Sequence, residues 1–132
     1  MATINNFEEL EIWIKARKLN KRILEISQRE SIKKDFRFYS QIRSLAGSIM
    51  DNIAEGFERD SRLEFINHLS YSKGSCGEIQ SQLFRAFDDN TITEDEHNEL
   101  ILEYKTLARD IGNFIRYLNK SDIKGQKFLD RK

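Results

Sequence analysis

Apolar residues recur at intervals of three and four along most of the chain, which is the spacing of one face of an α-helix. This spacing predicts four helices, over residues 7–29, 36–58, 61–88 and 93–119. The chain contains no proline, so nothing in its composition forces an early break in any of these helices.

Capping residues support the predicted helix starts. Asn6, Asp35, Ser61 and Thr93 stand where the four helices should begin, and their side chains can accept hydrogen bonds from the first backbone N–H groups. A glutamate follows Asn6, Ser61 and Thr93 at the third residue, which is the spacing of a capping box. Local sequence therefore defines the start of each helix.

Four helices of similar length with short linkers are typical of an all-α, antiparallel up-down-up-down four-helix bundle. We expect residues 1–120 to form this domain and residues 121–132 to be a polar, basic C-terminal tail. The first helix then lies beside the fourth, where Glu96, Glu99 and Glu103 can face its basic residues. Part of the charge should be used in pairs between helices.

The net charge of zero conceals segregation along the chain. Residues 1–50 carry a net charge of +4, residues 51–104 carry −9 and residues 105–132 carry +5. A nucleic-acid binder needs a local basic surface to contact phosphates, and the first and fourth helices together could supply one. The residues proposed for nucleic-acid binding are Lys15, Arg17, Lys18, Lys21, Arg22, Arg109 and Arg116.

Two features indicate contacts beyond the core of one bundle. Gly74 and Gly77 lie inside the third predicted helix, where each costs about 1 kcal/mol relative to alanine, so we expect a neighbouring helix to approach closely. Several large apolar residues also lie off the main stripes, and exposed apolar patches mark interfaces. The residues proposed for an oligomer interface are Trp13, Ile14, Phe38, Phe84 and Ile115.

Catalytic and metal-binding patterns are incomplete. Cys76 is the only cysteine, has no histidine within a helical turn, and reads as a small buried residue. Glu94 and His97 match one Glu-x-x-His motif of a di-iron bundle, but the required second motif is missing. We expect no enzyme activity, no metal and no cofactor.

The sequence shows neither a signal peptide nor a membrane-spanning segment, so we expect a cytoplasmic protein.

Several segments, taken in register, resemble one protein family. Residues 52–59 read Asn-Ile-Ala-Glu-Gly-Phe-Glu-Arg, and residues 10–13, 41–43 and 74–79 fit the same pattern. The chain resembles the bacterial four helix bundle protein family, which includes the 23S rRNA intervening-sequence proteins. It departs from the family at Ser44, where a second arginine is usual.

The resemblance implies a ring-like homopentamer with a possible role in RNA binding. A related branch, the accessory protein of diversity-generating retroelements, acts with a reverse transcriptase and nucleic acid.

The most distinctive residues read as a structural polar motif, in which an amide fixes helix register and a carboxylate pairs with an arginine. These residues are Arg43, Asn52, Glu55, Gly56 and Arg59.

The leading hypothesis is a non-catalytic, homo-oligomeric binding or scaffold protein that engages RNA or DNA, alone or in a ribonucleoprotein. The alternative is a protein–protein interaction module with no nucleic-acid binding. Binding driven by phosphates weakens steeply with salt, whereas an apolar protein interface does not, so salt dependence separates the two.

Overall fold

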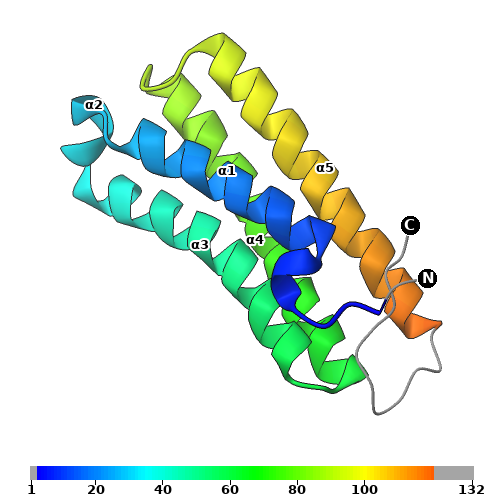
Figure 1. Cartoon of the computed structure of the whole chain (residues 1–132). Coiled ribbons are helices and arrows are strands. Elements are labelled where there is room, and N and C mark those ends of the chain that lie inside the picture. The colour runs from blue at the N-terminus through cyan, green and yellow to red at the C-terminus, as the bar shows by residue number, and fades with distance from the viewer. Residues whose placement is uncertain (1–2, 121–132) are drawn as a thin grey trace.

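The computed structural model describes residues 3–120 and shows an all-α antiparallel bundle (Figure 1). Three helices match the predicted ones closely: α3 (Phe36–Glu58), α4 (Arg62–Asp88) and α5 (Glu94–Asn119). The side chain of Asp35 accepts a hydrogen bond from the Phe38 backbone N–H, as expected. Thr93 and Glu96 form a complete capping box.

The first predicted helix is divided in the structure. Phe7–Glu9 forms a 3₁₀ turn, η1, and the continuous helix α1 begins only at Glu11 and ends at Ser27. Leu10 separates them with extended backbone angles, φ −72° and ψ 128°, and buries its side chain. Asn6 does not cap a backbone group: its amide donates to the Glu9 carboxylate at 3.0 Å.

The linker between α1 and α3 contains a further short helix, α2 (Glu30–Lys33), which buries Ile32. In Figure 1, α2 lies at the end of the bundle where α1 and α3 meet. At the turns after α3 and α4, Asp60 and Asn90 adopt positive φ angles of 55° and 61°, a left-handed conformation that commonly ends helices.

The core runs the length of the bundle and uses the predicted stripes. The largest fully buried side chains come from all four long helices and from α2, and they are Ile23, Ile32, Ile49, Ile53, Phe57, Phe65, Leu69, Ile79, Leu83, Leu100, Tyr104 and Leu107. The helix pairs α3–α4 and α4–α5 pack most extensively, and α1 contacts α5 far less than it contacts α3. The seam between α1 and α5 is therefore the most open one in the bundle.

The prediction for Gly74 and Gly77 is wrong within one subunit. A Cβ atom added at either residue meets nothing within 4 Å, and both residues are exposed on α4. Close approach occurs instead at Gly56 of α3, where an added Cβ would lie 2.7 Å from the Cβ of His68 on α4.

No helix among residues 3–120 is long and apolar enough to span a membrane.

Candidate nucleic-acid interface

Some of the basic residues of α1 pair across the seam with α5, as the sequence predicted. Lys15 Nζ lies 2.7 Å from Asp110 Oδ2, and the guanidinium of Arg22 pairs with Glu99. These bonds hold both cations against the bundle. The hydrogen bond to Glu99 also raises the pKa of Arg22.

A further pair joins Arg29 to Glu96, one of the acidic residues that the sequence placed opposite the first predicted helix. The Arg29 guanidinium contacts both carboxylate oxygens and also donates to the Thr91 carbonyl at 3.0 Å. Hydrogen bonds from Arg29 and from the Thr93 backbone lower the pKa of Glu96 from 4.5 to about 2. We call Lys15–Asp110 and Arg22–Glu99 the α1–α5 ion pairs, whereas Arg29 binds Glu96 from the N-cap position of α2.

The other α1 cations form no ion pair with α5 among the described residues. Arg17, Lys18 and Lys21 are exposed on adjacent turns, and no salt bridge within residues 3–120 involves any of them. Arg17 lies over the ring of Trp13, with its Cζ 5.7 Å from the ring centroid. These three residues, the outer α1 cations, remain available to an anionic partner.

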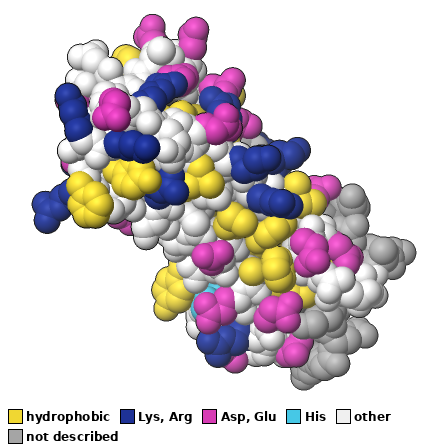
Figure 2. Space-filling view, turned by 60° about the vertical axis from the view of Figure 1, so that its left-hand side comes forward, with side chains coloured by type: hydrophobic (Ala, Val, Ile, Leu, Met, Phe, Trp, Pro, Cys, Tyr) yellow, Lys and Arg dark blue, Asp and Glu magenta, His cyan; other side chains and the backbone are white. Residues whose placement is uncertain are grey.

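The two arginines nominated on α5 interact with their own helix. Arg109 Nη2 lies 3.5 Å from Asp110 Oδ1, and Arg116 hydrogen-bonds the Asn113 side chain. On the face shown in Figure 2, basic and acidic side chains are interspersed. The outer α1 cations are therefore a local basic cluster on a surface of mixed charge.

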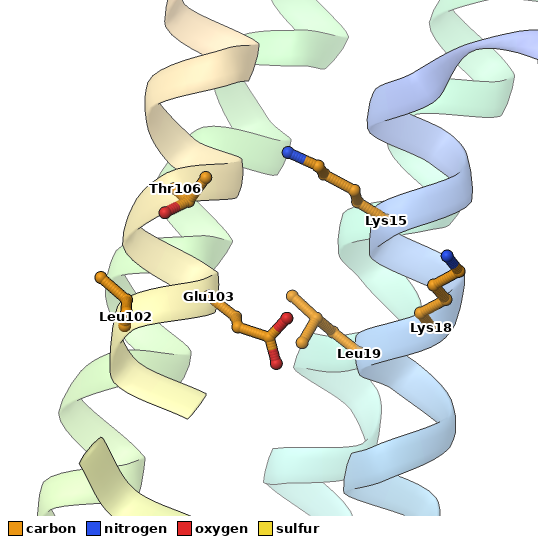
Figure 3. A pocket seen from close by; sticks show the side chains of 6 residues that line it. All are labelled: Lys15, Lys18, Leu19, Leu102, Glu103 and Thr106. Carbon is orange, nitrogen blue, oxygen red and sulfur yellow. The ribbon is translucent and has the colours of Figure 1, made fainter. Parts of the chain in front are cut away.

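A cavity of about 210 Å³ opens between α1 and α5, beside the outer α1 cations. We call it the α1–α5 cavity, and its lining residues are Lys15, Lys18, Leu19, Leu102, Glu103 and Thr106. In Figure 3, Glu103 extends from α5 towards Leu19 of α1. The sequence did not predict that Leu102 and Thr106 line a cavity, because the spacing of apolar residues along one helix does not reveal a gap between two helices.

The predicted polar motif joins the end of α3 to the start of α4. Asn52 Oδ1 lies 3.0 Å from His68 Nδ1, and the Asn52 amide donates to the Ser48 carbonyl at 3.0 Å. Arg59 Nη2 lies 2.8 Å from Glu55 Oε2 on the same helix. These contacts agree with a structural role for the motif, and His68 is the member that sequence analysis did not identify.

Arg43 does not join this group. Its guanidinium donates to Ser27 Oγ at 2.8 Å and lies over the ring of Tyr39 at 4.9 Å. Arg43 therefore connects α3 to the end of α1. Of the two arginines in the predicted motif, Arg59 is the one that forms the ion pair with Glu55.

The apolar interface candidates differ in how far they are exposed. Ile14 and Phe84 are exposed, at 38% and 50%, whereas Trp13 and Ile115 pack partly against the core. Phe38 is only 7% exposed, so its proposed place at an interface is corrected: it belongs to the core. Leu102, which also lies off the main apolar stripes, is exposed as well, and three exposed apolar residues were missed, namely Phe36, Leu63 and Tyr71.

The groups with potential chemistry are buried. Cys76 is fully inaccessible, and burial raises the pKa of its thiol to about 12, which keeps it protonated and poorly nucleophilic. Burial also raises the pKa of Tyr104. Residues 3–120 contain no group of three or more His, Cys, Asp or Glu side chains placed to hold a metal ion.

Comparison with known proteins agrees with this architecture. The model of the 23S rRNA-intervening sequence protein family matches residues 8–113. A crystal structure of a protein with unknown function from the S23 ribosomal protein family of Bacteroides thetaiotaomicron is similar, with a TM-score of 0.73 and 22% identity. That match covers 80% of this chain and 95% of the other. No curated protein matches the chain.

Proposed function

The chain belongs to the 23S rRNA-intervening sequence protein family, and from this premise we propose that it is a non-catalytic, homo-oligomeric protein that binds single-stranded nucleic acid. The outer α1 cations carry the proposal. Arg17, Lys18 and Lys21 are exposed on adjacent turns, whereas the neighbouring Lys15 and Arg22 are held by α5.

The three outer α1 cations of one subunit contribute only a small electrostatic part of the affinity for nucleic acid. Three phosphate contacts on a single strand give a slope of about −2 in a plot of log affinity against log salt concentration. Repetition of the same cluster on several subunits converts later contacts into intramolecular ones, which raises avidity without any new contact. The proposed function therefore includes self-association, in the pentameric form that the family resemblance implies.

Exposed apolar side chains support self-association. Phe36, Leu63, Tyr71 and Leu102 are each 64–75% exposed. Phe36 begins α3 and Leu63 lies just beyond the other end of α3, so these residues are separate apolar contact points and not one patch. In Figure 2, hydrophobic side chains gather in the lower middle of the face shown.

Charge reversal of the outer α1 cations tests the proposal. Binding of a fluorescent single-stranded RNA and its DNA counterpart is measured by anisotropy across a salt titration. Lys18→Glu with Lys21→Glu should weaken binding about tenfold or more and flatten the salt slope by at least about 1.4. Lys33→Glu with Lys34→Glu is the matched control, because both lysines are exposed near α2. Equal losses in the two variants, or no binding by the wild type, would contradict the proposal.

A protein partner is the second candidate, and one observation favours it. Ile14 on α1 and Leu102 on α5 are exposed, and Leu102 lines the α1–α5 cavity. A protein that docks on these apolar groups would bind with little dependence on salt, and charge reversal at Lys18 and Lys21 would leave its affinity nearly unchanged.

A further inference from the structure

We propose that the α1–α5 cavity binds one unpaired guanine base of a single-stranded nucleic acid. This inference rests on the proposed function and deepens it, because it names the part of the nucleic acid that enters the protein. The cavity adjoins the outer α1 cations through Lys18, which belongs to both. A strand whose phosphates follow these cations therefore passes the mouth of the cavity.

The position of the cavity follows from the spacing of the α1–α5 ion pairs. Lys15–Asp110 closes the seam on one side, and Arg22–Glu99 closes it about two turns further along α1. Between them no ion pair within residues 3–120 joins the two helices, and Leu19 of α1 faces this gap. The gap is thus bounded by charged pairs at both ends.

The walls of the cavity suit a flat ring with polar edges. Leu19, Leu102 and the aliphatic stems of Lys15 and Lys18 supply apolar surface. The volume of about 210 Å³ exceeds that of an engineered cavity of about 150 Å³ that binds benzene, which is room of the order of one base. Bases of single strands are commonly inserted into such sites because they are free of a pairing partner.

Glu103 determines which base fits. Its carboxylate extends into the gap in Figure 3, and no salt bridge within residues 3–120 involves it. An ionised carboxylate only accepts hydrogen bonds, and it has two oxygens for a pair of adjacent donors. The Watson–Crick edge of guanine presents such a pair, N1–H and N2–H. Adenine and cytosine present only one amino group there, and uracil places carbonyls on both sides of its N–H.

The remaining polar groups complement the other atoms of guanine. Thr106, Lys15 and Lys18 line the same cavity, with the Lys15 ammonium group bonded to Asp110 and the Lys18 ammonium group turned away from the gap in Figure 3. These groups can donate to the guanine O6 carbonyl or to a phosphate. The two lysines also offset the repulsion between Glu103 and a phosphate backbone.

The test compares oligouridine strands of about ten nucleotides that carry one central guanosine, adenosine or cytidine, with all-uridine RNA as the reference. Binding is measured by anisotropy with the full chain. The wild type should bind the guanosine strand about tenfold more tightly than the other three. Glu103→Gln should abolish this preference while binding of all-uridine RNA is retained.

Glu25→Gln is the matched control, because Glu25 is an exposed glutamate of α1 outside the cavity lining. It should keep the guanosine preference. Equal wild-type binding of all four strands, or a preference that survives Glu103→Gln, would overturn the base-site inference and leave the proposed function standing. Absence of binding to every strand would overturn both.

Discussion

Gly56 of α3 and His68 of α4 lie so close that a Cβ atom on Gly56 would be 2.7 Å from the His68 Cβ. Phe65 Cδ1 would be 3.0 Å from the same added atom. One turn earlier on α3, Asn52 holds the His68 ring through a 3.0 Å contact to Nδ1. A missing side chain and a specific polar contact together fix how α3 meets α4.

Substitution of Gly56 by alanine should therefore destabilise the bundle. The added methyl group has to displace His68 and the buried Phe65, and overpacking of this kind costs about 1–3 kcal/mol of unfolding free energy. Chemical denaturation followed by circular dichroism measures the change. Gly47→Ala on the same helix is the control, since its Cβ would meet nothing within 4 Å; it should be neutral or stabilise by up to about 1 kcal/mol. A tolerated Gly56→Ala would show that the two helices can separate at little cost.

Removal of the Tyr104 hydroxyl should not harm the fold. The side chain is 1% exposed, and its hydroxyl has no hydrogen-bond partner among the described residues. A buried polar group without a partner costs about 1–3 kcal/mol, so Tyr104→Phe should raise the free energy of unfolding by about 1 kcal/mol.

Ser72→Ala provides the contrast to Tyr104→Phe. Its buried hydroxyl donates to the Ile49 carbonyl at 2.7 Å, and loss of such a bond lowers stability by about 0.5–1.5 kcal/mol. If Tyr104→Phe were the more damaging of the two, the Tyr104 hydroxyl would have a partner that this account omits.

The bond between Arg29 and Glu96 should make stability depend on acid pH. The pKa of Glu96 is about 2 in the folded chain, below its ordinary value of 4.5, so the folded state binds this proton less readily than the unfolded state. The stabilisation is complete above about pH 4.5 and is lost as the pH falls towards 2. The difference in unfolding free energy between the wild type and Glu96→Gln should shrink across that window. A difference that stays constant from pH 7 to pH 2.5, or one reproduced by Glu94→Gln, would refute this assignment.

Release of Lys15 from α5 should strengthen nucleic-acid binding. Asp110→Asn removes the carboxylate that holds Lys15, at a cost of about 0.2–1 kcal/mol for an exposed pair. The freed ammonium group adds one phosphate contact, so the salt slope should steepen by up to about 0.7. Asp51→Asn, which removes an exposed carboxylate of α3, controls for the change in net charge. Unchanged affinity in Asp110→Asn together with a gain in Asp51→Asn would indicate a binding surface on α3.

The sequence predicts helices well where the signal is local. Asp35 and Thr93 mark the starts of α3 and α5 because a capping side chain acts on backbone groups within its own turn. The break at Leu10 was missed because its burial depends on neighbouring helices. Phe38 lies off the apolar stripe of α3, yet it is buried, and it shares the lining of a cavity with Ser31 and Ala86 from other segments.

The candidate site was predicted less completely, for the same reason. Sequence spacing correctly placed basic residues of α1 opposite acidic residues of α5, since up-down topology makes the two helices neighbours. It could not separate Lys15 and Arg22, which are paired, from Lys18 and Lys21, which are not. Nor could it show that Glu103 faces a gap, because that depends on how two distant helices diverge.

Native mass spectrometry of the protein, purified at low salt without nuclease, reports the number of subunits and any bound nucleic acid in one experiment. We expect a homo-oligomer that carries bound nucleic acid, which is lost at high salt and in the variant with Lys18→Glu and Lys21→Glu. A monomer, or an oligomer free of nucleic acid under the same conditions, would contradict this expectation.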